Sequence, residues 1–212
     1  MNAPTTRKLW GIGTARTLRA HWALLELGLP YDIEPVVPRT SSMDGEAFLA
    51  VSPDKKVPVL QDGTLTIAES PAIVLYLCER YATDAMRLFP KTTAERARLF
   101  EWVSYISMEL DATTLYVLRR HLDLADTYGD APAAVQSARA YFARMVGRAA
   151  RTFADGRPYL LGDQFSAVDI LLVSCFGAAD RFGAELPDEL TDYRAHVCAR
   201  RAYQSATKVN TP

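Results

Sequence analysis

The pair Asp62-Gly63, set between two short apolar runs, constrains the fold of this chain more than any other sequence feature. An Asp-Gly pair in that setting is a strong signal for a tight β-hairpin. Upstream, residues 8–12 and 31–36 have strand patterns, and residues 16–27 between them have the apolar spacing of a helix. A crossover gives parallel strands and a hairpin gives antiparallel strands, so the sequence predicts a mixed sheet.

The region up to residue 82 completes this pattern. Pro35 cannot donate a hydrogen bond to a neighbouring strand, so the second strand is expected at an edge of the sheet. Residues 46–51 have room for one or two helical turns. Ser70 suits a helix N-cap and Pro71 suits a first helical position, which predicts a helix to about residue 80. The expected order is β-α-β-(α)-β-β-α.

The pattern breaks over residues 83–91, which we expect to form a linker, and the remainder of the chain is helical in pattern. Two capping boxes open helices, one formed by Thr92 and Glu95 and one by Ser166 and Asp169. The sequence thus predicts an α/β domain over residues 1–82 and an all-α helical bundle over residues 92–212. The helices of the second domain are expected from residue 92 through the apolar positions Leu99, Val103, Ile106 and Leu110, and over residues 132–153, 166–182 and 187–201. The polar tail, residues 204–212, is expected to be loose.

Composition excludes several function classes. The 212 residues are 49% hydrophobic and 23% charged, which is typical of a globular domain. Lys and Arg number 24 against 25 Asp and Glu, so no basic excess favours nucleic acid or an anionic membrane as partner. The longest apolar run is far too short for a membrane span, and the first residues lack the apolar core of a secretory signal. A cytoplasmic location is expected.

The three cysteines, Cys78, Cys175 and Cys198, have no CxxC or CxxH spacing. We therefore expect neither a disulfide framework nor a metal site, and we interpret the cysteines as small buried apolar residues.

Three short motifs have the chemistry of a binding site. Val57-Pro58 stands at a strand start, where a cis peptide would turn main-chain polar groups outward toward an extended peptide. Glu69-Ser70 opens a helix, whose free N–H groups suit a carboxylate while Glu69 suits an ammonium group. Together they would fit the two charges of an α-amino acid. A trans proline and an ordinary helix cap are the alternatives.

The third motif, residues 11–17, joins the first strand to the first helix and contains Thr14, Arg16 and Thr17. A hydroxyl at a helix N-terminus can donate to a thiolate, and the helix dipole lowers a thiol pKa. Simple capping by Thr14 or Thr17 is the alternative. The string is not GxGxxG, so it does not indicate a dinucleotide site.

These motifs, in this order, resemble the cytosolic glutathione transferases, with theta-, nu- and bacterial beta-like features but no clear class. The strings that carry the resemblance are RAHWALLELGLPY at 19–31, KVPVL at 56–60, ESPAI at 69–73, EWVSYISMEL at 101–110 and YLLGDQFSAVD at 159–169. The resemblance covers nearly the whole chain. It implies a thioredoxin-like domain followed by an all-helical domain, a homodimer, and glutathione as co-substrate.

The resemblance also implies residue roles. Val57, with Pro58 cis, would pair its main chain with the cysteinyl unit of glutathione. Glu69 and Ser70 would hold the γ-glutamyl end, and Lys56 would meet the glycyl carboxylate. Thr14 would activate the thiol, with Thr17 as the fallback, and Glu109 would reach the glutathione of a partner subunit. A small hydrophobic electrophile would bind along the long helix, around Tyr105, Met108, Asp111, Thr114 and Tyr116.

The chain departs from the named classes at three points. Arg16 occupies the position of the beta-class catalytic cysteine, and Asp111-Ala112 replaces a beta-class His-Lys pair. No tyrosine ends the first strand. Because a nearby positive charge favours a thiolate, we infer that Arg16 shares in its stabilisation.

The leading hypothesis is a glutathione transferase that conjugates the thiolate to a small electrophile, a detoxification chemistry. A glutathione-dependent lyase or dehalogenase, for example one that cleaves ethers, and a non-catalytic protein of the same fold remain as alternatives. A disulfide reductase is disfavoured because no cysteine lies near Thr14.

Overall fold

The computed structural model describes residues 7–83 and 86–212, which form two compact units. One unit contains the residues up to Phe89 together with Ala199–Pro212, and the other contains Pro90–Cys198. The C-terminal segment therefore groups with the α/β unit, although the chain reaches it only after the helical unit. Residues 84–85 of the expected linker lie outside the described residues.

The α/β unit is built on a four-stranded sheet in the order β2-β1-β3-β4. The strands are β1 (Arg7–Trp10), β2 (Asp32–Glu34), β3 (Val59–Asp62) and β4 (Leu65–Ala68). Strand β1 runs parallel to β2 and antiparallel to β3, and β3 pairs with β4 in a hairpin through Gly63, whose φ is +62°. The mixed sheet, the edge position of β2 and the Asp62-Gly63 hairpin are thus confirmed.

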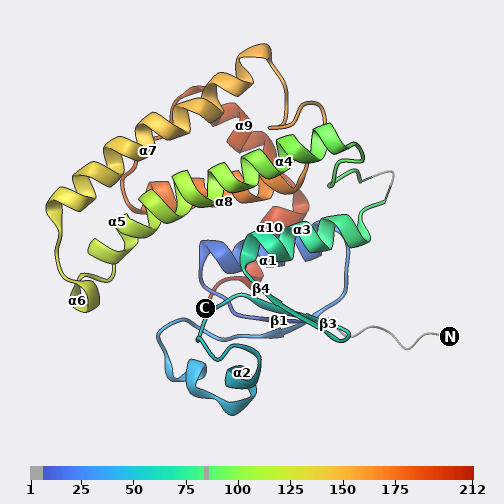
Figure 1. Ribbon diagram of the computed structural model, residues 1–212, viewed down its shortest axis with the longest axis vertical. Helices are drawn as coiled ribbons and strands as arrows, with labels where there is room; N and C mark the ends of the chain where they lie inside the picture. Colours follow the sequence, from blue (N-terminus) through green and yellow to red (C-terminus); the bar gives the residue numbers. More distant parts are fainter. Residues whose placement is uncertain (1–6, 84–85) are drawn as a thin grey trace. The chain divides into compact units, whose positions relative to one another are not determined.

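Helices α1 (Ala15–Glu26) and α3 (Ser70–Tyr81) lie on one side of the sheet, and α2 (Glu46–Val51) lies on the other (Figure 1). The two longer helices pack against each other and bury their apolar faces. Leu24, Ile73 and Leu77 of these helices are fully buried, as are Leu9 and Leu60 of the central strands. This is the thioredoxin-like arrangement that the family resemblance implies.

The start of α3 differs from the prediction by one residue. Glu69 is the N-cap, Ser70 is the first helical residue, and Pro71 follows it. Proline is tolerated there because the first turn has no intrahelical partner for its missing N–H. Ser70 consequently makes no capping bond, and its buried hydroxyl is directed to another partner.

The C-terminal segment is helical rather than loose. Helix α9 (Glu189–Cys198) ends before the predicted boundary, and a separate helix, α10 (Arg201–Val209), follows it and packs on α1. Tyr203 meets the ring of Trp22 edge-on with centroids 4.8 Å apart. Arg200 also forms an ion pair with Glu26 of α1. These contacts to α1 explain why a segment that looks polar in sequence is ordered.

The second unit is all-helical, as expected. Its helices are α4 (Thr93–Tyr105), a π-helical stretch η2 (Ile106–Leu115), α5 (Tyr116–His121), α6 (Ala125–Tyr128), α7 (Pro132–Thr152), the short turn η3 (Phe153–Asp155), α8 (Ala167–Arg181) and α9. Both predicted capping boxes are present, at Thr92 and Ser166. Helix α8 is buried over most of its length and packs against η2 and α4.

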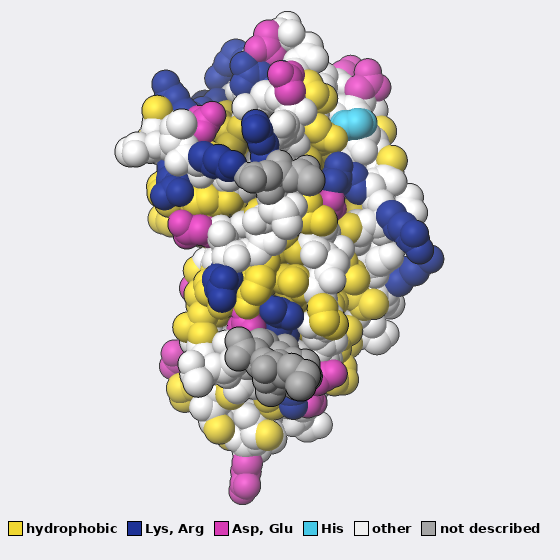
Figure 2. Space-filling view, turned by 90° about the vertical axis from the view of Figure 1, so that its right-hand side faces the viewer, with side chains coloured by type: hydrophobic (Ala, Val, Ile, Leu, Met, Phe, Trp, Pro, Cys, Tyr) yellow, Lys and Arg dark blue, Asp and Glu magenta, His cyan; other side chains and the backbone are white. Residues whose placement is uncertain are grey.

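Charged side chains of both signs are interspersed over the face drawn in Figure 2, in keeping with a net charge of −1. Among the described residues, none of the helices is long and apolar enough to span a bilayer.

Candidate functional site

The strand register brings the three sequence motifs to one end of the sheet. Trp10, the last residue of β1, pairs with Val59, the first of β3, which in turn pairs with Ala68, the last of β4. The segment after β1, the segment before β3 and the segment after β4 therefore leave the sheet at the same end of its strands. Residues 11–17, Val57-Pro58 and Glu69-Ser70 lie next to these three strand ends, although the first motif is far from the other two in sequence.

Gly11 of the first motif packs directly against Val57 of the second. The Val57-Pro58 peptide is cis, as the resemblance implies. Gly11 has a φ of +113°, and a Cβ at that position would lie 2.5 Å from Cβ of Val57. Only glycine fits there, for both steric and conformational reasons. The glycine thus lets the first turn pack directly against the cis-proline segment.

Thr14 is the N-cap of α1 and forms a capping box with Thr17. The Thr14 hydroxyl accepts the Thr17 N–H at 3.0 Å, and the Thr17 hydroxyl accepts the Thr14 N–H at 2.9 Å. Capping, the alternative given by the sequence for both threonines, is therefore their local structural role. In the capping box both hydroxyl oxygens act as acceptors. The atom to which each hydroxyl donates its own hydrogen depends on its other neighbours.

The two threonines differ in what those neighbours offer. Thr17 is fully buried, and its hydroxyl lies 2.9 Å from the Thr14 carbonyl and 2.6 Å from Oδ1 of Asn210. Both oxygens only accept, so the single hydrogen of Thr17 is used inside the protein. Thr14 is half-buried at the end of the turn. The Thr14 hydroxyl also has a neighbour inside the protein, because it lies 3.0 Å from the Thr17 hydroxyl. Thr14 is the less buried of the two residues, so its role as the donor to a ligand stays a prediction.

His21 supports the same turn from within α1. Its Nε2 lies 3.1 Å from the Gly11 carbonyl and its Nδ1 lies 2.9 Å from the Tyr31 hydroxyl. Burial lowers the pKa of His21, and the Gly11 hydrogen bond offsets this only in part. A neutral ring that donates from Nε2 and accepts at Nδ1 satisfies both partners. Burial also raises the pKa of Tyr31 to about 12, so its hydroxyl stays a donor.

At the start of α3, Glu69 adopts a φ of +65°, which is rare for a residue with a side chain. Such backbone costs of order 1–3 kcal/mol and is found most often at functional sites. The adjacent Ser70 hydroxyl accepts a hydrogen bond from Arg19, a side chain only 2% exposed, at 3.3 Å. A helix N-terminus, a serine hydroxyl and a buried guanidinium together create a positive environment suited to a carboxylate.

Lys56 and Lys55 precede the cis-proline and behave differently. The main chain of Lys56 exchanges hydrogen bonds with the Ser52 hydroxyl, both 2.9 Å long, and its side chain is exposed. Lys55 instead pairs with Asp44 at 2.6 Å. The structure therefore fixes the backbone of Lys56 next to Val57. Arg16 lies in the first turn of α1, between the two threonines.

Glu109, the residue expected to reach a partner subunit, lies in the helical unit. There it accepts a hydrogen bond of 2.5 Å from the hydroxyl of Tyr141 on α7. This contact raises the pKa of Tyr141. Within one chain, the carboxylate of Glu109 thus links η2 to α7.

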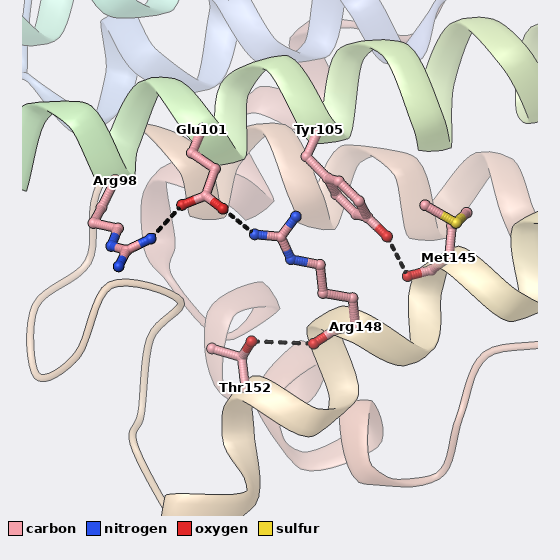
Figure 3. A network of polar contacts seen from close by, with 6 residues as sticks. All are labelled: Arg98, Glu101, Tyr105, Met145, Arg148 and Thr152. Carbon is pink, nitrogen blue, oxygen red and sulfur yellow. Dashed lines mark hydrogen bonds and ion pairs between the residues drawn. The ribbon is translucent and has the colours of Figure 1, made fainter.

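Tyr105, predicted to touch a second substrate, is engaged within the helical unit. Its hydroxyl donates to the Met145 carbonyl at 2.8 Å, and the Arg148 guanidinium lies 4.5 Å from its ring centroid (Figure 3). Arg148 also pairs with Glu101, which Arg98 contacts from the other side. These two hydrogen bonds lower the pKa of Glu101.

Other members of that set have varied surroundings. Thr114 is buried and donates to the Leu110 carbonyl, whereas Met108 is 58% exposed. Asp111 and Tyr116 are half-buried, in η2 and at the start of α5. Because these surroundings differ, the joint role of the set stays a prediction.

Three residues that support the first turn and α3 have no counterpart among the sequence predictions. They are His21, Arg19 and Asn210, and their partners lie 10, 51 and 193 positions away along the chain. A buried histidine and arginine look like ordinary helix residues, and Asn210 lies in a polar tail. Sequence offers no signal for any of these pairings. In the part of the chain that the structure describes, no three His, Cys, Asp or Glu side chains cluster as metal ligands would.

Comparisons with known proteins agree on one family. Residues 15–80 match the family described as Glutathione S-transferase, N-terminal domain. Glutathione S-transferase 3 of Zea mays is 30% identical over 165 residues, which are 76% of this chain and 73% of the maize protein. The glutathione S-transferase-like protein gedE of Aspergillus terreus is 36% identical over 100 residues, only 46% of this chain and 43% of the fungal protein.

A solved structure extends the similarity over the full length. The theta class glutathione S-transferase of Xanthomonas axonopodis pv. citri, solved with glutathione bound, superposes with a TM-score of 0.83. The two share 28% sequence identity, and the match covers 98% of this chain and 100% of the other.

Proposed function

Because the chain belongs to the glutathione S-transferase family, we propose that it binds glutathione at the end of its sheet and transfers the thiolate to a small hydrophobic electrophile. The observation that carries the proposal is that three segments meet at one end of the strands: the Thr14 turn, the cis Val57-Pro58 peptide and the Glu69-Ser70 helix start. They offer a hydroxyl for a thiolate, main-chain polar groups for an extended peptide, and a helix N-terminus beside an acid for the two charges of an amino acid.

The main chain of Val57 would pair with the cysteinyl unit, which is an extended peptide. Glu69 and Ser70 would bind the γ-glutamyl end, since its ammonium and carboxylate groups need opposite charges side by side. The Arg19–Ser70 bond supports this, because it adds a buried positive charge behind the serine. Lys56, exposed beside Val57, would pair with the glycyl carboxylate.

The chemical step needs a thiolate, because the thiol itself is a weak nucleophile. The Thr14 hydroxyl would donate to the sulfur, while the N-terminal end of α1 and the charge of Arg16 would add positive potential. The sulfur would then form a bond to the electrophilic carbon, whose leaving group departs with the bonding pair. The proton lost from the thiol goes to solvent.

Cleavage of an ether or displacement of a halide would use the same thiolate on a different carbon. A panel of aryl halides, alkyl halides and aryl ethers, assayed with glutathione, separates these reactions by their released products. Glutathione binding without turnover on any of them would instead favour the non-catalytic alternative.

The binding step has a direct test by thermal unfolding. At 100 times its dissociation constant, a ligand that binds only the folded state stabilises it by about 2.7 kcal/mol. We expect glutathione to raise the melting temperature, and Glu69→Gln to reduce this shift. Glu79→Gln serves as the matched control, because Glu79 is an exposed acid further along the same helix. An unchanged melting temperature of the parent protein at millimolar glutathione would contradict the proposal.

A further inference from the structure

Asn210 connects the C-terminal helix to the turn that contains Thr14. It caps the C-terminal end of α10, and its own main-chain carbonyl accepts the Gly13 N–H at 2.8 Å. Its side chain makes three more contacts to the same turn. Oδ1 accepts the Thr17 hydroxyl at 2.6 Å and the Gly13 N–H at 3.2 Å, and Nδ2 donates to the Thr14 carbonyl at 3.0 Å.

Both polar atoms of the Asn210 side-chain amide thus contact the turn. An amide oxygen accepts and an amide nitrogen donates, so Asn210 matches a hydroxyl, an N–H and a carbonyl at once. The residue after next, Pro212, lies over Gly13, where an added Cβ would approach its Cγ to 2.8 Å. Gly13 also has a φ of +85°, which glycine adopts readily. Contacts from Asn210 and Pro212 therefore stabilise the conformation of this turn.

Asn210 also determines how the two neighbouring hydroxyls, of Thr14 and Thr17, are arranged. The Thr17 hydrogen has acceptors in Asn210 and in the Thr14 carbonyl, and that carbonyl already accepts from Leu18 N–H and from Asn210 Nδ2. The shortest of the Thr17 contacts is the one to Asn210. Thr17 then acts toward Thr14 as an acceptor only, for the Thr14 N–H and for the Thr14 hydroxyl, which lies 3.0 Å away. The Thr14 main chain is fixed on both sides of its Cα, by Thr17 at the N–H and by Asn210 at the carbonyl.

We propose that Asn210 is a positioning residue for thiolate stabilisation: it holds the Gly13–Thr14 main chain and the Thr17 side chain, and so fixes the place of the Thr14 hydroxyl. When a thiolate is bound, the Thr14 hydrogen turns from Thr17 Oγ1 to the sulfur, because a charged acceptor forms the stronger hydrogen bond. This inference rests on the proposed function, since it concerns the same thiol. It assigns a role in the N-terminal site to a side chain that the sequence places at the far end of the protein.

The test is the pKa of the thiol of bound glutathione, measured from thiolate absorbance against pH. Asn210→Ala should raise this pKa by about 0.5–1 unit, the equivalent of one neutral hydrogen bond. Turnover should fall at neutral pH and recover at high pH. Asn210→Asp keeps the shape and the acceptor, loses the donor and adds a negative charge, so it should raise the thiol pKa further than alanine does.

Thr211→Ala is the matched control. Thr211 is the neighbouring residue, and its exposed hydroxyl donates to the Thr207 carbonyl of α10 at 2.9 Å. We expect the thiol pKa of this variant to equal that of the parent protein. A purely structural role for Asn210 would lower the melting temperature of the variants and leave the thiol pKa unchanged.

The outcomes separate the two proposals. If the parent protein binds glutathione with a lowered thiol pKa and both Asn210 variants keep that pKa, the positioning role is refuted and the proposed function stands. If the parent protein shows neither glutathione binding nor a melting shift, both fall. A larger shift for aspartate than for alanine, with Thr211→Ala unchanged, supports the positioning role.

Discussion

The side-chain oxygen of Asn210 lies 2.6 Å from the hydroxyl of Thr17, a residue 193 positions earlier in the chain. This contact uses the Thr17 hydrogen inside the protein, and the Thr17 oxygen then accepts from the N–H of Thr14 and lies 3.0 Å from its hydroxyl. Sequence alone offers both threonines, together with Arg16, as candidates for the thiolate stabiliser. We expect Thr14 to be the donor, because Thr17 is fully buried and its hydrogen has Asn210 as an acceptor, whereas Thr14 is half-buried.

Removal of the Thr14 hydroxyl should raise the thiol pKa of bound glutathione. One charge-assisted hydrogen bond contributes about 1.5–3 kcal/mol, which corresponds to roughly one to two pH units. Thr14→Val should therefore be slow at neutral pH and recover at high pH, while Thr14→Ser stays active. The measurement is thiolate absorbance titrated against pH. An unshifted Thr14→Val alongside a shifted Thr17→Val or Arg16→Ala would assign the role to that other residue.

Lys56 and Lys55 form a natural pair of variants for the glycyl end of glutathione. Lys56→Ala should weaken glutathione binding, and the loss should shrink as salt is added, because exposed charge pairs are screened. Lys55→Ala should leave the affinity unchanged, since Lys55 is paired with Asp44. Calorimetric titration at two ionic strengths distinguishes the two lysines, and equal effects of both variants would argue against a specific role for Lys56.

His21 should make stability depend on pH. Its pKa in the folded protein lies below the ordinary value of 6.5, so the unfolded chain binds more protons as the pH falls below that value. The free energy of unfolding should thus be highest above about pH 6.5 and decrease toward the lower folded pKa, with a limiting slope of about 1.4 kcal/mol per pH unit.

Urea unfolding at several pH values measures this slope. His21→Gln, which keeps a donor but cannot titrate in this range, should flatten it. His196→Gln, at an exposed position, should leave it as it is. A slope that persists in His21→Gln would mean that another group titrates.

The two capping boxes should differ in what they contribute to stability. Asp169 is fully buried and accepts from the N–H of Leu160, from the N–H and hydroxyl of Ser166, and from the hydroxyl of Tyr193. Asp169→Ala leaves several buried donors unpaired, at about 1–3 kcal/mol each, so we expect a loss of about 3–5 kcal/mol.

Thr92→Ala is the matched comparison, because the Thr92–Glu95 box is exposed. It should cost about 1 kcal/mol. Denaturant midpoints of the two variants give the contrast. Equal losses would show that burial of the Asp169 network adds nothing beyond capping.

We expect a homodimer, as the family resemblance implies. Phe100 and Met108 of the long helical segment are 47% and 58% exposed, and pairing of two chains through this segment would bury them. Light scattering at micromolar concentration should give twice the chain mass, and Met108→Glu should lower it. A monomer mass for the parent protein would overturn this expectation.

Local sequence determined much of the fold. The Asp62-Gly63 hairpin, the edge position of β2 and both capping boxes follow from turn, proline and capping chemistry that acts over a few residues. For the same reason the motifs that bear Thr14, Val57 and Glu69 are recognisable in the amino-acid sequence itself, since each combines special residues at short spacing.

Only the tertiary structure decided how those motifs are completed. The register of β1, β3 and β4 brings the three motifs to one end of the strands. Long-range contacts place Arg19 next to Ser70 and Asn210 next to Thr17. The tail looks loose in sequence because it is short and polar, although Ala202, Tyr203, Ala206 and Val209 have the spacing of one helical face. Packing on α1 is what orders it. A single hydroxyl hydrogen is directed by whichever acceptor the folded chain brings closest, and that choice is not encoded in any local pattern.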